Sequence, residues 1–236
     1  SRSFGISSEQ TMRAAQNLYE NGYCTYIRTD SVRTAPEAIT EVREWLQNNK
    51  YAVPKKANVF KTKNAAQDAH EWIRPTDLSL LPSDNVEIIN PIEQKVYGVI
   101  WKHFVASQMC PALYDTLKIV AQVKGRPDLQ VKASGKALKE KGFLEILDFV
   151  KSETQELELP MVVVGDTLTL FGKEPIRVEQ KFTQPPPRYS EDKLIKELDT
   201  KSIGRPSTYS ELISKITARN YVQKDGNMFH ATELGK

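Results

Sequence analysis

The sequence has few of the residues that build disulfide scaffolds and metal sites. It contains two cysteines, Cys24 and Cys110, and three histidines among 236 residues. Two distant cysteines provide neither a disulfide framework nor the paired spacing of a zinc site, so we expect no metal site in this chain and a reducing, cytoplasmic environment. No apolar run approaches the length of about 20 residues that a membrane-spanning helix needs, which predicts a soluble protein without a membrane partner.

A strong excess of one charge is also missing. The chain has 33 Lys and Arg against 30 Asp and Glu, which gives a net charge of +3 at pH 7. A dedicated duplex-binding protein is usually more basic, so this balance permits nucleic-acid contact without indicating it. Because 39% of the residues are hydrophobic, a chain of this length is able to bury one or two cores.

Hydrophobic periodicity divides the chain into three predicted domains of an α+β, multidomain fold. Residues 1–112 follow the helical period around one short strand and predict a helical domain. Helix starts are predicted at Ser7 with Gln10, at Thr34 with Glu37, at Asn64, and at Asn90 with Glu93. Met12, Ala15, Leu18 and Tyr19 form the predicted apolar stripe of the first helix.

Residues 113–185 change to the period and the β-branched composition of antiparallel strands. Strands are predicted at 116–123, 129–133, 162–164 and 167–170, turns at 125–128 and 165–166, and a helical insert near 143–150. Three prolines at 185–187 lead into residues 186–236, where two helices and a hairpin around Gly226 are predicted. That order suits a winged-helix DNA-binding module; a generic helical cap with a hairpin is the alternative.

One short stretch places a nucleophile near a cation. Tyr23–Ile27 is β-branched and aromatic, which predicts a strand, and side chains two residues apart on a strand share one face. We therefore expect Tyr26 beside Arg28. An ordinary phenol is about a thousandth ionised at neutral pH, and a guanidinium nearby favours the phenolate and is able to hold a phosphate oxygen. The alternative is a strand with a surface arginine, followed by a Thr-Asp-Ser turn.

Tyr26–Ser31, with the sequence Tyr-Ile-Arg-Thr-Asp-Ser, resembles the nucleophile motif of the type IA DNA topoisomerases. Two further stretches resemble motifs of the same family in the same order. They are Ala69–Thr76 (Ala-His-Glu-Trp-Ile-Arg-Pro-Thr) and Ile203–Tyr209 (Ile-Gly-Arg-Pro-Ser-Thr-Tyr). The three motifs span nearly the whole chain, and the bacterial topoisomerase I branch is the most similar.

The resemblance implies an isomerase that relaxes negatively supercoiled DNA by single-strand cleavage, strand passage and religation without ATP. Tyr26 would form a 5′-phosphotyrosyl link, Arg28 would balance charge on the phosphate, and His70 would hydrogen-bond the same phosphate. Supporting roles are expected for Thr29, Asp30, Glu71 and Arg74. Contacts with single-stranded DNA are expected from Arg205, Ser207 and Thr208. The helix predicted from Asn64 to Pro75 would place His70 and Arg74 on one face.

The family's Mg²⁺ and its general-acid glutamate belong to a Toprim domain, which precedes the nucleophile region. Nothing in this chain fits that domain, so we expect a central fragment whose partner is the rest of the same polypeptide. Such a fragment is predicted to bind single-stranded DNA weakly and to be inactive alone. Trp72 stands where the family usually has a small residue, and its ring either crowds the site or stacks on a base.

Two other classes of function are weighed against the topoisomerase. One is a non-enzymatic, single-stranded nucleic-acid-binding module built on the last 51 residues, 186–236. The other is a tyrosine recombinase or a rolling-circle nuclease. Recombinases surround the tyrosine with several arginines and histidines, and rolling-circle enzymes carry paired metal-binding histidines; the isolated His70, His103 and His230 do not form such a pair.

Overall fold

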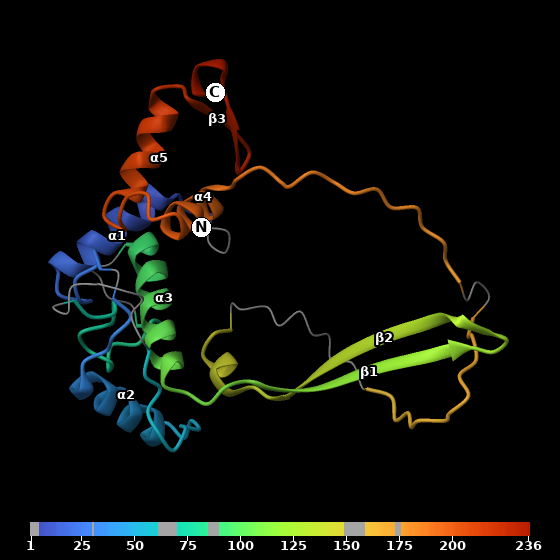
Figure 1. Ribbon diagram of the computed structural model, residues 1–236. Coiled ribbons are helices and arrows are strands. Elements are labelled where there is room, and N and C mark those ends of the chain that lie inside the picture. The colour runs from blue at the N-terminus through green and yellow to red at the C-terminus, as the bar shows by residue number, and fades with distance from the viewer. Residues whose placement is uncertain (1–4, 30, 61–69, 85–89, 149–158, 173–175) are drawn as a thin grey trace. The chain divides into compact units, whose positions relative to one another are not determined.

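The computed structural model describes residues 5–29, 31–60, 70–84, 90–148, 159–172 and 176–236 (Figure 1). In these residues the fold is mixed α and β, with five α-helices and two antiparallel sheets of two strands each. The chain forms two compact units. The helical unit comprises Ser1–Cys110 with Pro187–Lys236, and the ribbon unit comprises Pro111–Pro186. The first and last parts of the chain thus share one unit, and the division into three domains stays a prediction.

Two helices of the helical unit begin at the predicted capping boxes. α1 (Ser8–Glu20) starts where the Ser7 hydroxyl accepts the Gln10 N–H at 3.1 Å and the Gln10 side chain accepts the Ser7 N–H at 2.9 Å. Asn90 and Glu93 form the same reciprocal pair at the start of α3 (Pro91–Ser107). The two helices pack against each other. Their largest buried side chains include Leu18, Trp101, Phe104 and Val105.

The start of α2 (Pro36–Asn48) differs from the prediction. Its N-cap residue is Ala35, whose side chain makes no cap hydrogen bond, so the predicted cap at Thr34 is wrong. Pro36 in the first turn has its φ preset for a helix, and Glu37 lies near the positive end of the helix dipole. These two features replace the side-chain cap. The helix buries Ala38, Val42 and Leu46.

The last part of the chain follows the predicted order of two helices and a hairpin. α4 (Glu191–Thr200) and α5 (Tyr209–Ala218) precede β3 (Val222–Asp225) and β4 (Met228–Ala231), and α5 contacts α1. The hairpin turns at Gly226, which has a φ of +55°, a conformation that suits glycine. Ser190 occupies the N-cap position of α4 as predicted, but its hydroxyl makes no cap bond and is buried without a partner among the described residues.

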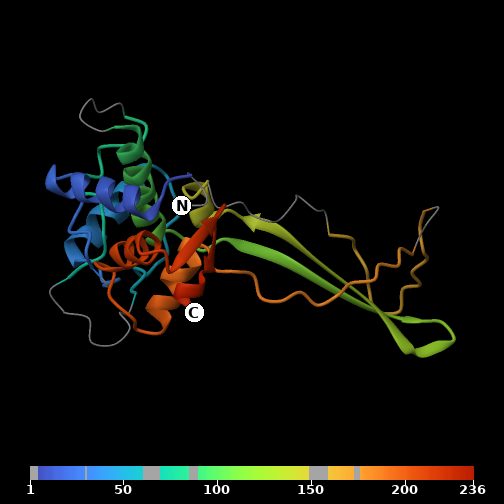
Figure 2. The same ribbon diagram turned by 90° about the horizontal axis from the view of Figure 1, so that it is seen from above.

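The ribbon unit is built on one long hairpin. β1 (Leu113–Val123) pairs with β2 (Arg126–Glu140), and Figure 2 shows the two strands running side by side. The predicted turn at 125–128 is wrong in extent, because Arg126 is already paired with Val123. Gly125, with a φ of +80°, makes the tight turn possible. A 3₁₀ helix at Gly142–Glu145 overlaps the start of the helical insert predicted near 143–150, whose residues 149–150 fall outside the described part of the chain.

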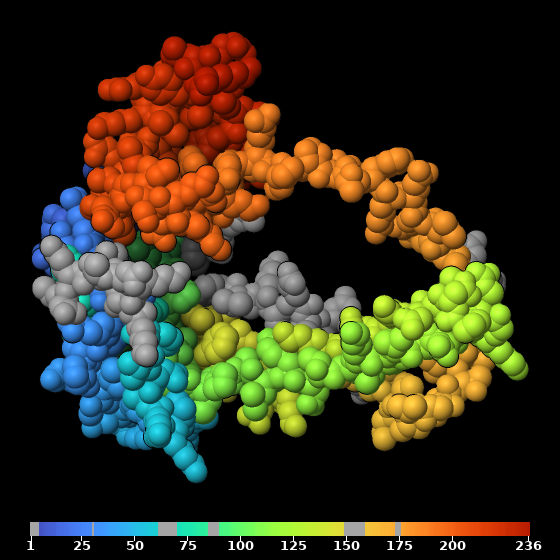
Figure 3. Space-filling view, in the orientation of Figure 1, coloured from blue at the N-terminus to red at the C-terminus, as the bar shows by residue number. Residues whose placement is uncertain are grey.

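The strands predicted at 162–164 and 167–170 are wrong. Neither segment belongs to a strand, although the predicted turn is present, with the Asp166 N–H donating to the Val163 carbonyl at 3.2 Å. Composition favours an extended backbone, but a strand also needs a partner for its hydrogen-bonding groups, and none pairs with them in the described chain. Met161, Val164 and Phe171 are fully exposed. Figure 3 shows the following residues, 176–186, as a thin, extended chain.

No helix in the described part of the chain is both long and apolar enough to cross a membrane.

Candidate active site

The first two motifs lie against each other in the helical unit. The Thr25 N–H donates to the Arg74 carbonyl at 2.9 Å, and the Thr76 N–H donates to the Tyr23 carbonyl at 3.2 Å. Between these bonds, Cys24 and Pro75 form one antiparallel bridge. The predicted strand Tyr23–Ile27 is therefore wrong in extent, because the last backbone bond of this pairing is made by Thr25.

The predicted helix around the second motif is also wrong where the structure describes it. Residues 70–74 are not helical, and residues 64–69 lie outside the described chain. The backbone of this segment bonds to other parts of the chain: the Trp72 N–H donates to the Arg33 carbonyl at 2.7 Å, and Arg74 bonds to Thr25. His70 and Arg74 consequently do not share a helical face.

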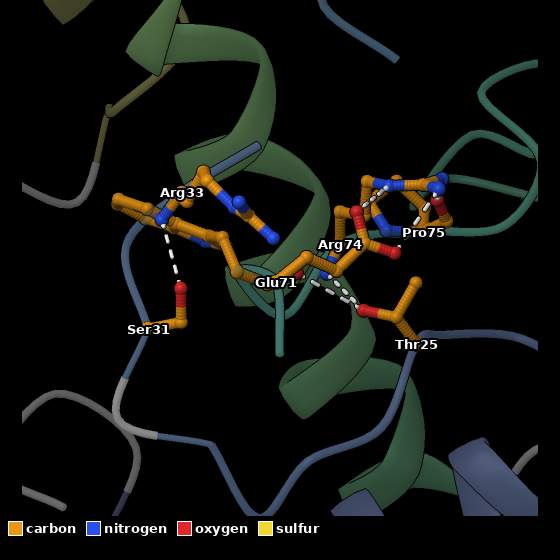
Figure 4. Close-up of polar contacts among 7 residues, drawn as sticks. Thr25, Ser31, Arg33, Glu71, Arg74 and Pro75 are labelled. Carbon is orange, nitrogen blue, oxygen red and sulfur yellow. Dashed lines mark hydrogen bonds and ion pairs between the residues drawn. The ribbon is translucent and has the colours of Figure 1, made fainter. Parts of the chain in front are cut away.

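The Thr25 hydroxyl, one residue before the predicted nucleophile Tyr26, forms two hydrogen bonds with the backbone of the second motif. Thr25 Oγ1 donates to the Trp72 carbonyl at 3.1 Å and accepts the Arg74 N–H at 3.0 Å. Figure 4 shows the contact of Thr25 with Arg74, together with the Arg33 N–H donating to Ser31 Oγ. Thr25 precedes Tyr26, so these bonds fix the backbone from which the phenol projects.

The Tyr26 ring lies between aromatic groups from two different elements. Its centroid is 5.3 Å from the Tyr19 ring of α1, in an edge-to-face arrangement, and 5.8 Å from the His70 ring. The Tyr26 side chain is 42% exposed, whereas the next residue, Ile27, is only 5% exposed. The phenol is thus held near His70 and stays open to solvent.

Arg28 shares the exposed side of this segment with Tyr26. Burial alternates from exposed Tyr26 to buried Ile27 to exposed Arg28. In the described residues no hydrogen bond or ion pair joins Arg28 to Tyr26 or His70. Its guanidinium is exposed on the same side as the phenol, and the predicted position of Arg28 beside Tyr26 stays a prediction.

The predicted supporting residues serve the local backbone. Arg74 forms a two-point ion pair with Glu71, with Nε to Oε2 at 3.1 Å and Nη2 to Oε1 at 3.3 Å. Arg74 Nη1 also donates to the Pro75 carbonyl at 3.2 Å, so this charge pair stabilises the bend of its own segment. The Thr29 hydroxyl accepts the Ser31 N–H at 3.0 Å. Asp30 lies outside the described residues.

The third motif forms the entry to α5. Thr208, the residue before this helix, accepts the Arg205 N–H at 2.9 Å and donates to the Arg205 carbonyl at 3.0 Å through its hydroxyl. Arg205 and Ser207 are exposed. Gly204 has a φ of +82°, and a β-carbon there would approach the Thr208 hydroxyl to 3.1 Å, so the motif needs glycine at this point. The described contacts do not join this motif to the first two.

Two further observations limit the chemistry of the site. Cys24, two residues before Tyr26, is 2% exposed, and burial raises its pKa to about 12, so its thiol does not compete as a nucleophile. Among the described residues no cluster of three His, Cys, Asp or Glu is arranged to hold a metal ion. These side chains therefore do not fit a Mg²⁺ site.

Sequence analysis missed the roles of Tyr19 and Thr25. Tyr19 is predicted on the buried stripe of α1, but it is 38% exposed and its ring contacts Tyr26. The contact forms across the end of the helix, where Gly22 reverses the chain with a φ of +76°. No periodic pattern relates residues on either side of such a turn. The bonds of Thr25 reach a segment 47 to 49 residues away, which local sequence does not reveal.

Comparison with known proteins gives one consistent match. A family model for DNA topoisomerases matches residues 1–236. The DNA topoisomerase 1 of Escherichia coli is 38% identical over 234 residues, covering 98% of this chain and 26% of that protein. The DNA topoisomerase 1 of Pseudomonas aeruginosa is 40% identical over 238 residues, covering 100% of this chain and 26% of that protein.

A solved structure agrees with these sequence matches. The full-length topoisomerase I of Thermotoga maritima is similar with a TM-score of 0.78 and 29% sequence identity, over 98% of this chain and 38% of that chain. The chain thus spans about a quarter of the length of the curated relatives. The match of the family model over the whole chain shows that the chain belongs to the DNA topoisomerase family, and its relatives are bacterial DNA topoisomerases 1.

Proposed function

We propose that this chain is the central, nucleophile-bearing part of a type IA DNA topoisomerase that relaxes negatively supercoiled DNA. The observation that carries the proposal is the exposed Tyr26 phenol, which lies beside His70 in a chain of this family. An exposed tyrosine held by two aromatic neighbours and a hydrogen-bonded backbone suits an attacking group, because catalysis gains from a nucleophile that is already in place.

In the proposed reaction, Tyr26 Oη attacks the phosphorus of one DNA strand. The bond from Oη to phosphorus forms as the bond from phosphorus to the 3′ oxygen breaks; the phenol loses its proton and the departing oxygen gains one. The resulting 5′-phosphotyrosyl link retains the energy of the phosphodiester, so religation by the 3′ hydroxyl needs no ATP. Tyr26 thus serves as nucleophile in one direction and as leaving group in the other.

Arg28 and His70 are the proposed partners of the phosphate. The Arg28 guanidinium is exposed on the same side as the phenol, and His70 contacts the Tyr26 ring. A guanidinium and an imidazole both donate hydrogen bonds to non-bridging phosphate oxygens, where negative charge accumulates as the phosphorus becomes five-coordinate. Arg205, Ser207 and Thr208 are proposed to hold the same single strand further along, at the start of α5.

The proposal assigns Mg²⁺ and the proton donor to another part of the polypeptide. The side chains described here do not form a metal site, and the relatives are about four times as long as the region that this chain matches. We therefore propose a Toprim-bearing segment as the partner of this chain and expect the chain alone to bind single-stranded DNA weakly without relaxing supercoiled DNA.

Trapping of a covalent adduct tests the proposed function. The chain is incubated with Mg²⁺ and a labelled single-stranded oligonucleotide, alone and mixed with a Toprim-bearing piece of a relative. A 5′-linked adduct at Tyr26 in the mixture, absent in Tyr26→Phe, is the expected result. No adduct in either sample, from folded protein that binds the oligonucleotide, would contradict the proposal.

A second function is supported by the last part of the chain. Two helices followed by the β3–β4 hairpin have the order of a winged-helix module, which binds nucleic acid without cleaving it. For such a binding module, Tyr26→Phe changes nothing and a deletion of residues 187–236 abolishes oligonucleotide binding. The adduct experiment therefore separates the two functions directly.

A further inference from the structure

We propose that Tyr19 is a positioning residue for the nucleophile: its ring holds the Tyr26 ring in the orientation for attack. This inference rests on the proposed function of Tyr26. It assigns a role to a residue that lies outside all three sequence motifs.

Tyr19 is attached to a rigid part of the helical unit. It lies in the last turn of α1, next to Leu18, which is 1% exposed in the core. The end of the helix is fixed by the Gly22 N–H donating to the Tyr19 carbonyl at 3.0 Å and the Tyr23 N–H donating to the Leu18 carbonyl at 2.8 Å. These two bonds fix the backbone of Tyr19 and of the residue before it.

Tyr26, in contrast, projects from a segment without regular secondary structure. Its pairing to the second motif ends one residue earlier, at Thr25, and its side chain is 42% exposed. An exposed side chain on such a segment samples several staggered rotamers. The edge-to-face contact with Tyr19, with centroids 5.3 Å apart and an interplanar angle of 69°, favours one of them.

The contact with Tyr19 orients the Tyr26 ring against a helix packed into the core, which the contact with His70 does not do. The His70 ring lies 5.8 Å from Tyr26 at a tilt of 47° and is itself expected to reach the phosphate. Tyr19 comes from a helix packed into the core, so it provides a fixed reference for the phenol. Displacing a reacting group by about 1 Å can cost up to about 100-fold in rate, which makes such a reference useful.

A neighbouring pair provides a matched control. Tyr23 and Tyr97 form a similar edge-to-face contact, with centroids 6.4 Å apart and an interplanar angle of 73°. Tyr23 lies three residues before Tyr26, but its ring packs against α3. Truncating Tyr23 therefore removes an aromatic pair of the same kind from the same region and leaves the Tyr19–Tyr26 contact in place.

The test combines a measurement on the chain alone with the adduct assay. In nuclear magnetic resonance spectra of the chain without DNA, the ring signals of Tyr26 should shift in Tyr19→Leu and stay in place in Tyr23→Leu. In the mixture with the Toprim-bearing piece, Tyr19→Leu should form the adduct about 3- to 10-fold more slowly at saturating oligonucleotide, with an unchanged Kd. Tyr19→Phe, which keeps the ring, should restore at least half of the rate.

The outcomes separate the two proposals. Equal adduct rates in Tyr19→Leu and Tyr23→Leu, or a Tyr19→Phe variant as slow as Tyr19→Leu, would overturn the positioning role and leave the proposed function standing. An adduct that persists in Tyr26→Phe, or a wild-type mixture that forms none, would overturn the proposed function and this inference with it.

Discussion

The hydroxyl of Thr25 offers the sharpest test of how the first two motifs are held together. Thr25→Val keeps the shape and the β-branching of the side chain and removes both hydrogen bonds. The Trp72 carbonyl loses a donor at 3.1 Å, and the Arg74 N–H loses its acceptor at 3.0 Å. The backbone bond from the Thr25 N–H to the Arg74 carbonyl remains, so the segments lose part of their connection.

The expected loss follows from these two bonds. One intramolecular hydrogen bond contributes about 0.5–1.5 kcal/mol, and a backbone group left unpaired in a buried place costs about 1–3 kcal/mol. Both bonds of Thr25 are only partly buried, so water compensates for some of the loss. We expect the free energy of unfolding to fall by about 2 kcal/mol.

Urea denaturation of the wild-type chain, Thr25→Val and Thr25→Ser measures this loss. The serine variant keeps the hydroxyl and lacks only the methyl group, so it should lie closer to the wild type than the valine variant does. Hydrogen exchange at the Arg74 amide should accelerate in Thr25→Val. A valine variant within about 0.5 kcal/mol of the wild type, or a serine variant as destabilised as the valine, would refute the argument.

Three other predictions test separate features of the helical unit. At pH 8, iodoacetamide should modify Cys110 before Cys24, as judged by mass spectrometry. Because burial raises the pKa of Cys24 from 9.0 to about 12, its thiol ionises first in the unfolded chain, so the free energy of unfolding should decline from pH 9.0 to about 12. Cys24→Ala should make that decline smaller without removing it, since burial also raises the pKa of Tyr97. Asn90→Ala removes the side-chain cap of α3 and should lower the free energy of unfolding by about 1 kcal/mol in thermal melts, and Asn90→Asp should not. The Trp72 ring packs against Phe60 with centroids 5.9 Å apart. Trp72→Ala should therefore lower the free energy of unfolding by about 1 kcal/mol in denaturation and leave the oligonucleotide Kd unchanged. Weaker binding would show that Trp72 stacks on a base.

Local signals explain which elements could be predicted from sequence. The starts of α1 and α3 depend on Ser7 and Asn90 within one turn of the helix, and the β3–β4 hairpin depends on Gly226, so a short window contains all the information. The strand at Tyr23–Ile27 and the helix at 70–74 failed for the opposite reason. Each segment has a suitable composition, but its backbone bonds are made with the other segment, about 50 residues away in sequence.

The site residues divide in the same way. The motif residues Tyr26 and His70 are found from the family resemblance, and the structure brings their rings together. Arg28 is placed on the exposed side by the alternation of burial around Ile27. Tyr19 carries no signal of this kind, since a tyrosine on a helical stripe is equally compatible with a core position. Only the reversal of the chain at Gly22 brings it to Tyr26.

The contacts of Tyr26 with described residues lie within the helical unit. Tyr19 comes from α1, Thr25 immediately precedes the first motif, and His70 belongs to the second. If the proposed function is correct, the nucleophile is therefore oriented before any metal-bearing part of the enzyme arrives, and that part contributes charge and a proton donor. On this view, weakening the Tyr19 or Thr25 contacts slows adduct formation even at saturating Mg²⁺. A defect rescued by more Mg²⁺ would instead place the orienting role with the metal.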